Sequence, residues 1–150
     1  MKDQLSLPKE FPNSSKDPFI ITSPITNSYN CIAWAFGDTT KWYWPDDYFF
    51  GFWPQEINRE CTLQSFINLY KLIGFEVCEN EKFEEGFEKI VIFTDNNNIP
   101  THAAKQINDS LWSSKLGGHH DVSHTKFSIE GGNYGNFNVI MKRKLNELIK

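Results

Sequence analysis

The sequence predicts an α+β domain in which N-terminal helices pack on a C-terminal antiparallel sheet. The first observation is helical: apolar side chains between residues 62 and 73 recur with the i, i+3, i+4, i+7 spacing of one helix face. The second concerns residues 89 to 142, where short apolar segments are separated by turn residues, as in strands joined by hairpins. A chain of 150 residues is long enough for one domain with a buried core.

The elements follow one another in a simple order. Residues 1–17 are polar and contain two prolines, so we interpret them as a flexible N-terminal arm before a single domain of residues 18–150. A short strand is predicted over residues 19–22 and a short helix over residues 31–36. The helix over residues 62–73 has Thr62 as its N-cap and Gly74 after its last turn. Strands are predicted over residues 75–78, 89–94, 101–107, 111–116, 122–129 and 136–142, followed by a helix over 142–150.

Composition excludes several classes of partner. The net charge is −4 and the longest basic run is Lys142-Arg143-Lys144, which argues against nucleic acid. No stretch approaches the roughly 18 apolar residues of a membrane helix, and no signal-peptide core is present, so we expect a cytoplasmic protein. The three cysteines form no CxxC pair, which favours reduced thiols over disulfides or zinc. No metal or other cofactor is expected.

Cys31 stands at the predicted start of the helix over residues 31–36, directly after Asn30. A thiol on the first turn of a helix faces unpaired backbone N–H groups, which favour the nucleophilic thiolate. The same N–H groups, beginning with that of Cys31, can hold a developing oxyanion. The sequence therefore predicts a nucleophilic cysteine that needs a base.

His102 is the best candidate for that base. It opens a strand directly after the turn at Pro100, and the two alanines that follow it let another element approach closely. The other interpretation of His102 is a buried strand-end histidine with a structural role. His119, His120 and His124 follow a glycine pair in an expected surface loop, and their spacing matches no standard metal site.

A third group usually orients the imidazole of such a pair, and the turn after residue 107 limits the choice. A two-residue turn sets His102 opposite Lys115, which could hold an anionic substrate group. A three-residue turn sets His102 opposite Leu116 and brings Ser114 onto the same face as a hydrogen-bond acceptor. Asp121 is the strongest chemical orienter nearby if its loop folds back. The sequence leaves these alternatives open.

Three motifs carry a resemblance to a known group of enzymes. They are Tyr-Asn-Cys-Ile-Ala-Trp at residues 29–34, Thr-His-Ala-Ala-Lys-Gln at 101–106 and Trp-Ser-Ser-Lys-Leu-Gly at 112–117. Together they resemble a bacterial family next to the papain-like cysteine hydrolases of the NlpC and CHAP kind. The resemblance implies a papain-like domain with Cys31 as nucleophile, His102 as base, and Asn30 or Tyr29 near the oxyanion. Those enzymes commonly carry His, Asn or Gln as third residue, where the matching strand of this chain offers serines and Lys115.

These observations predict a cysteine hydrolase or acyltransferase of the peptidase or amidase type, whose substrate is a peptide, a protein or another amide. Cys31 attacks the carbonyl, and His102, held by Ser114 or Asp121, takes the thiol proton and later protonates the leaving amine.

The aromatic segment 42–54 supports a different interpretation. It has neither a helical nor a strand period, so it either packs as an irregular lid or lines a substrate cleft with residues such as Trp44. The alternative function is a non-catalytic protein-binding module that uses this loop, with Cys31 as a small buried apolar residue.

Overall fold

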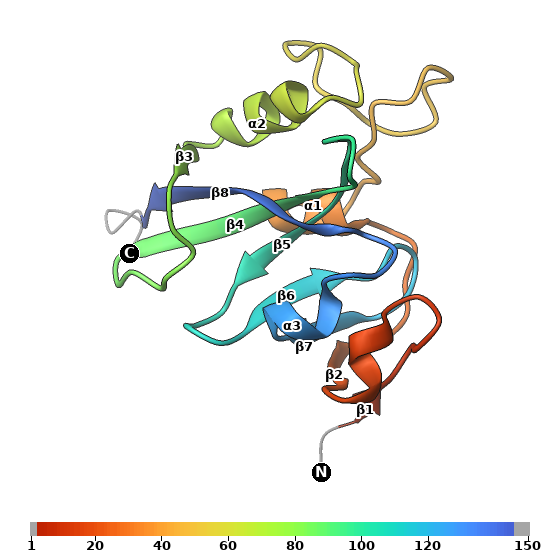
Figure 1. Ribbon diagram of the computed structural model, residues 1–150. Coiled ribbons are helices and arrows are strands. Elements are labelled where there is room, and N and C mark those ends of the chain that lie inside the picture. Colours follow the sequence, from red (N-terminus) through yellow and green to blue (C-terminus); the bar gives the residue numbers. More distant parts are fainter. Residues whose placement is uncertain (1–2, 146–150) are drawn as a thin grey trace.

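The computed structural model describes residues 3–145 and contains an eight-stranded sheet in the order β1-β2-β7-β6-β5-β4-β8-β3 (Figure 1). All neighbouring strands are antiparallel. The strands are β1 (Gln4–Leu5), β2 (Phe19–Ser23), β3 (Glu76–Cys78), β4 (Phe87–Thr94), β5 (Pro100–Gln106), β6 (Trp112–Lys115), β7 (Asp121–His124) and β8 (Asn136–Lys144). The helices are α1 (Cys31–Phe36), α2 (Leu63–Lys71), α3 (Lys126–Ile129) and a 3-10 helix, η1 (Pro12–Ser15).

The predicted fold class, papain-like helices packed on a C-terminal sheet, is wrong, because the fold is β-rich. The three α-helices have only six, nine and four residues. The sheet also draws strands from the whole chain, since Ile20 of β2 pairs with Ser123 of β7. In residues 3–145 no helix is long and apolar enough to cross a membrane.

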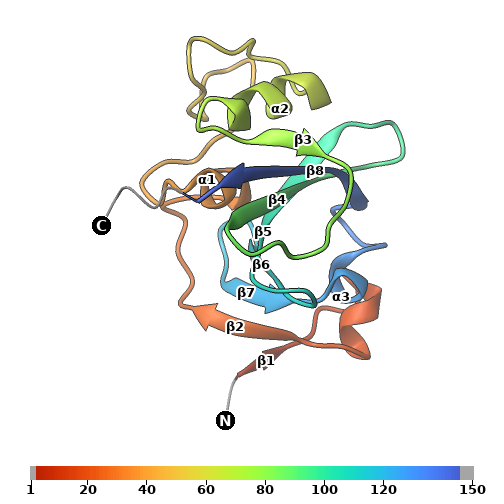
Figure 2. The same ribbon diagram turned by 90° about the vertical axis from the view of Figure 1, so that its left-hand side faces the viewer.

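The sheet has two buried faces, because successive side chains of a strand point to opposite sides. On one face Ile92 and Ala103 pack with α1 and α2. On the other face Phe93 and Ala104 pack with Phe11 and with α3. Figure 2 shows α1 and α3 on opposite sides of the sheet. We call these the α1 face and the α3 face.

Local sequence explains α1 and α2, and both predicted helices are confirmed. The side chain of Asn30 caps α1 by accepting a hydrogen bond from the N–H of Ala33, and Gly37 ends the helix with φ 97°. Thr62 caps α2 in the same way through the N–H of Ser65.

The connection between β5 and β6 settles the register that the sequence left open. Lys105 pairs with Ser113, which makes residues 108–110 the three-residue turn. β6 continues to pair with β7 as far as Lys115 and Asp121. The pairs between β5 and β6 begin at Lys105, so the two strands are separate at the start of β5.

One strand prediction and one helix prediction change near the C-terminal end. The strand expected over residues 122–129 is β7 followed by α3, because Thr125 accepts a hydrogen bond from the N–H of Ser128 and starts a helix. The helix expected over residues 142–150 is replaced by β8 as far as Lys144. Residues 146–150 lie outside the described part of the chain.

Much of the expected flexible arm packs against the sheet. β1 pairs with β2, and Phe11 is buried on the α3 face. Ser14 is also buried, and its hydroxyl accepts a hydrogen bond from the N–H of Leu7. These residues are held by tertiary contacts that the polar composition of the segment does not reveal.

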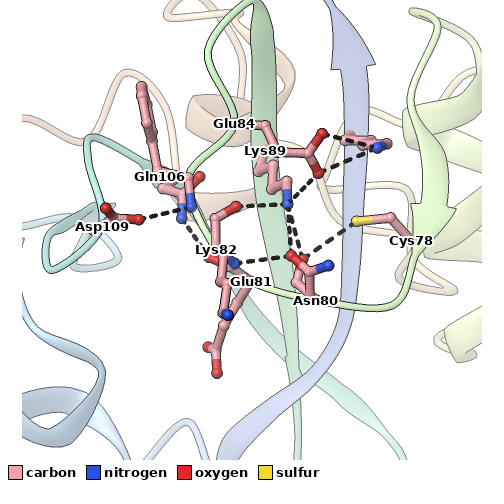
Figure 3. A network of polar contacts seen from close by, with 10 residues as sticks. Cys78, Asn80, Glu81, Lys82, Glu84, Lys89, Gln106 and Asp109 are labelled. Carbon is pink, nitrogen blue, oxygen red and sulfur yellow. Dashed lines mark hydrogen bonds and ion pairs between the residues drawn. The ribbon is translucent and has the colours of Figure 1, made fainter.

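A buried lysine holds the connection between β3 and β4. The Nζ of Lys89 donates to the carbonyl oxygens of Asn80 at 3.0 Å and Lys82 at 2.6 Å (Figure 3). It also pairs with the carboxylate of Glu84 at 2.9 Å, and the Lys89 side chain is 0% exposed. An ammonium has three protons, and each finds an acceptor here. We call these four residues the Lys89 cluster.

Candidate active site

Cys31 is the first residue of α1, and its thiol lies against β5. Backbone N–H groups of Ala103, Ile32 and Cys31 itself are directed at the sulfur. Ile107 donates its N–H to the carbonyl of Leu111, so the odd-numbered residues of β5 direct their N–H groups toward β6. The N–H of Ala103 therefore points into the opening where β5 and β6 are separate, and the sulfur lies at this opening.

Burial raises the pKa of the Cys31 thiol to about 11, although the backbone N–H groups and the Lys115 ammonium act to lower it. The expectation of a thiolate on the first turn of α1 is therefore wrong for this state, because loss of solvation outweighs the donors. The thiol is protonated at neutral pH, so it needs a base to become a nucleophile.

His102 precedes Ala103 on β5 and projects to the α3 face, beside Phe93. Its ring stacks on that of Tyr134, with centroids 3.8 Å apart and planes at 4°. The ring of Phe93 meets it edge-on at 4.9 Å. The imidazole is thus held on two sides by aromatic rings and is fully buried.

The structure brings Cys31 and His102 to the two sides of the same strand, not into direct contact. Burial and the charge of a Cys31 thiolate both raise the pKa of Tyr134, so Tyr134 lies within electrostatic reach of the sulfur. Ala103 is therefore a neighbour of both groups, since its N–H is directed at the sulfur and it follows His102 on β5. Among the described residues no hydrogen bond joins the thiol to the imidazole, and the expected direct pair is not formed in this state.

A chain of hydrogen bonds leads away from His102 across three strands. His102 Nε2 lies 2.9 Å from Ser114 Oγ, which lies 2.7 Å from His124 Nε2. The other ring nitrogen of His124, Nδ1, lies 2.9 Å from the carbonyl oxygen of Thr125. All three side chains are buried. We call these four residues the histidine chain.

The carbonyl at the end of the histidine chain determines where each proton lies. A carbonyl only accepts, so His124 Nδ1 carries a proton. Burial lowers the pKa of His124 to about 4, so the ring is neutral and its Nε2 accepts from the Ser114 hydroxyl. Ser114 Oγ in turn accepts from His102 Nε2–H.

The result is an unprotonated Nδ1 on His102. Burial, with His124 nearby, lowers the pKa of His102 well below its usual value, so this ring is neutral as well. Its Nδ1 is buried and has no hydrogen-bond partner among the described residues. The arrangement therefore leaves one imidazole lone pair free, as a general base requires.

The other predicted orienting and binding residues lie on the α1 face, whereas Ser114 contacts His102 as predicted. Asp121 Oδ2 accepts a hydrogen bond of 2.8 Å from the Tyr29 hydroxyl and does not contact His102. Lys115 donates to the carbonyl of Gly117 at 2.7 Å, and its Nζ lies 5.1 Å from the centroid of the Tyr29 ring. The hydrogen bond between Tyr29 and Asp121 thus ties the segment before α1 to β7, and neither residue orients the imidazole.

Asn30 and Trp44 have structural roles. The carboxamide of Asn30 caps α1 and also donates to the carbonyl of Tyr43 at 2.6 Å, which ties the aromatic loop to the helix. Trp44 packs edge-on against Phe66 of α2 at 5.5 Å, so it belongs to the core and walls no cleft beside His102.

Two site residues escaped the sequence analysis. The sequence predicts a strand over residues 122–129 but also groups His124 with the loop histidines, so it does not foresee that His124 is buried at the end of β7. Tyr134 follows a glycine pair, and no periodicity marks it. Both reach His102 through long-range contacts.

Comparison of the chain with curated proteins and with solved structures finds no match. Residues 20–142 match a family described as a domain of unknown function (DUF7689). The matched range includes Cys31, Tyr134 and the whole histidine chain. The chain therefore belongs to the DUF7689 family.

Proposed function

We propose that the protein is a cysteine-dependent hydrolase or acyltransferase that acts on an amide bond of a peptide or protein. The free Nδ1 of His102 carries this proposal. Leaving a buried polar atom without a partner costs about 1–3 kcal/mol, so such an atom calls for an explanation. A base that takes the thiol proton once Cys31 turns toward it explains the unpartnered atom.

In the proposed reaction His102 Nδ1 takes the thiol proton while the sulfur of Cys31 attacks the amide carbonyl carbon. A C–S bond forms, and the negative charge moves to the carbonyl oxygen. Backbone N–H groups of Cys31 and Ile32, which face the sulfur before attack, are suited to receive this oxyanion. Collapse breaks the C–N bond, the leaving amine takes the proton from Nδ1, and water or another amine then cleaves the thioester.

The resting state is closed. Cys31 is 6% exposed, and its thiol lies across the strand from the imidazole. Attack therefore requires the Cys31 side chain to turn into the opening between β5 and β6, where the strands carry no pairing hydrogen bonds to break. Loose catalytic contacts without substrate are common in enzymes of this type.

Acetylation by p-nitrophenyl acetate tests the proposal. Peptide mass spectrometry should find the acetyl group on Cys31 before Cys61 or Cys78, which are free thiols and serve as internal controls. The label should be lost in Cys31→Ser and strongly slowed in His102→Gln. The proposal is contradicted if the three thiols are labelled equally, or if Cys31 is labelled at the same rate in His102→Gln as in the wild type.

We also propose that this chemistry takes place in the cytoplasm on a peptide or protein amide. All three cysteines are free and none is bridged. A titration of freshly isolated protein should find three reduced thiols per chain, and a bridged pair would point to an oxidising compartment instead.

A second candidate is a non-catalytic protein-binding module, which the aromatic loop favours. Tyr48, Phe49 and Phe50 are 79%, 74% and 89% exposed. Arg59 holds the loop, because its guanidinium stacks on Phe49 at 4.4 Å and donates to the carbonyl of Gly51 at 2.7 Å. An exposed aromatic group on a fixed loop is typical of a binding surface.

Affinity capture with paired variants separates the two candidates. If the loop is the functional surface, Phe50→Ser should abolish capture of a partner, whereas Cys31→Ala should leave it unchanged. Capture that survives Phe50→Ser contradicts the binding module.

A further inference from the structure

We infer that the cavity beside Tyr134 receives a bulky uncharged side chain of the amide substrate; this inference rests on the proposed function. The cavity has a volume of about 570 Å³, within the range of ligand pockets. Its apolar lining consists of Leu5, Leu7, Phe11, Ile25, Leu116 and Tyr134.

The cavity and the candidate active site share the ring of Tyr134. Tyr134 lines the cavity, and its ring stacks on that of His102. Tyr134 also packs against the buried residues of the α3 face. Leu116 lines the cavity as well and packs in the same buried cluster as Phe93, whose ring meets His102 edge-on. A group bound in this cavity would therefore lie against the ring that stacks on the proposed base.

Segments far apart in the sequence build the walls. Leu5 and Phe11 come from the N-terminal segment, Ile25 from the connection between β2 and α1, and Leu116 from the end of β6. Ile25 is 59% exposed and marks the side open to solvent. The hollow is thus an open pocket between packed segments and not a closed packing defect.

The chemistry of the lining selects against negative charge. No lysine or arginine is among the residues that line this cavity. Its polar side chains are those of Glu10, Asn133, His119 and His120, and a ring nitrogen of His120 lies on the carbonyl oxygen of Ser23. An acidic side chain would lose its hydration and meet a like charge, whereas leucine or phenylalanine would bury apolar surface against apolar walls. The occupant is therefore a large aliphatic or aromatic side chain adjacent to the scissile amide.

Three coumarin amides test the inference: the 7-amino-4-methylcoumarin amides of N-acetyl-leucine, N-acetyl-glycine and N-acetyl-glutamate. Burial of the leucine side chain should raise kcat/KM for the leucyl amide about tenfold to a hundredfold above that for the glycyl amide. The glutamyl amide should be the poorest of the three substrates.

A charge at the pocket mouth sharpens the test. Ile25→Arg should raise the ratio of glutamyl to leucyl cleavage at least tenfold. The matched control is Ile107→Arg, which places the same charge at an exposed position after β5, away from the cavity.

The possible failures are distinguishable. Cleavage that needs Cys31 but shows no preference for leucine and no response to Ile25→Arg overturns the pocket inference and leaves the proposed function intact. If none of the three amides is cleaved in a Cys31-dependent manner and p-nitrophenyl acetate does not acetylate Cys31, the proposed function fails, and the pocket assignment fails with it.

Discussion

The Lys89 cluster and the histidine chain are two buried polar groups on the same sheet, and they differ in how completely their hydrogen bonds are made. In the first, each proton of a buried ammonium reaches an acceptor. In the second, hydrogen bonds run from Thr125 to His102 and stop at a ring nitrogen without a partner. A completed cluster contributes to the fold, whereas an unpartnered buried nitrogen calls for an explanation, and the one proposed for His102 is a general base.

Removing the imidazole should give the largest effect. His102→Gln should lower the rate of Cys31 acylation by about 10²–10⁴-fold, because the base is lost while an amide can still bond to Ser114. Single-turnover kinetics with p-nitrophenyl acetate measure this rate. Lys89→Met is the control from the other cluster and should leave the rate per folded molecule unchanged. If His102→Gln and Lys89→Met lower the acylation rate by the same factor, the two clusters do not differ in function.

Breaking the completed cluster should instead affect stability. Lys89→Met leaves the carbonyl of Lys82 without its side-chain donor and that of Asn80 with only the weak thiol donor of Cys78, and it should lower the free energy of unfolding by about 3 kcal/mol in a urea titration. Lys142→Met removes a partly exposed partner of the same Glu84 carboxylate and should cost less than about 1 kcal/mol. Equal losses in the two variants would show that burial of the ammonium is irrelevant.

The two clusters should also differ in their response to pH. The pKa of His124 is about 4 in the folded state and about 6.5 in the unfolded chain. The unfolded chain therefore binds more protons below pH 6.5, so stability is fully present above this pH and decreases toward pH 4. His124 alone should lower the free energy of unfolding by about 2 kcal/mol between pH 8 and pH 5, and burial of His102 acts in the same direction.

Urea titrations between pH 8 and pH 5 measure how steeply the free energy of unfolding falls with pH. His124→Gln should make this dependence shallower. The Lys89 cluster should not contribute, because hydrogen bonds from Lys89 and Lys142 lower the pKa of Glu84 and keep it ionised. Lys142→Met should therefore retain the slope of the wild type. A His124→Gln variant with an unchanged slope would mean that His124 is not buried as a neutral ring.

Interrupting the histidine chain in its middle should have the smallest effect. Ser114→Ala removes the acceptor that fixes the proton on His102 Nε2, and we expect a loss of acylation rate of about tenfold. The pH dependence of acylation should change as well, which a purely structural role would not produce. Ser113→Ala is the matched control, because this neighbouring hydroxyl faces Trp34 on the α1 face. An equal effect from both serines would remove Ser114 from the site.

Local signals predicted much of the fold. The apolar spacing and the Thr62 cap identified α2, and the apolar run from Ile90 to Phe93 identified β4. Of the two registers left open after β5, the three-residue turn is the one present, and with it Ser114 reaches His102. Each of these features depends on residues close together in the sequence.

What the sequence could not provide depends on distant partners. The pairing of β2 with β7 joins the N-terminal strands to the rest of the sheet, and no local pattern specifies it. His124 becomes part of the site only because β7 joins the sheet. Thr125 follows β7 and caps α3, although the apolar residues after it read as a continuing strand in the sequence. The lack of contact between Cys31 and His102 likewise follows from the strand alternation at Ala103, which sets the two groups on different sides.

The position of β8 has a consequence for how the chain is made. β8 lies between β4 and β3, so residues 136–144 enter the space between two strands that were synthesised earlier. Until they leave the ribosome, β3 has no neighbour and β4 exposes one edge, which is open to pairing with other chains. The sheet can therefore be completed only after nearly all of these 150 residues have been translated.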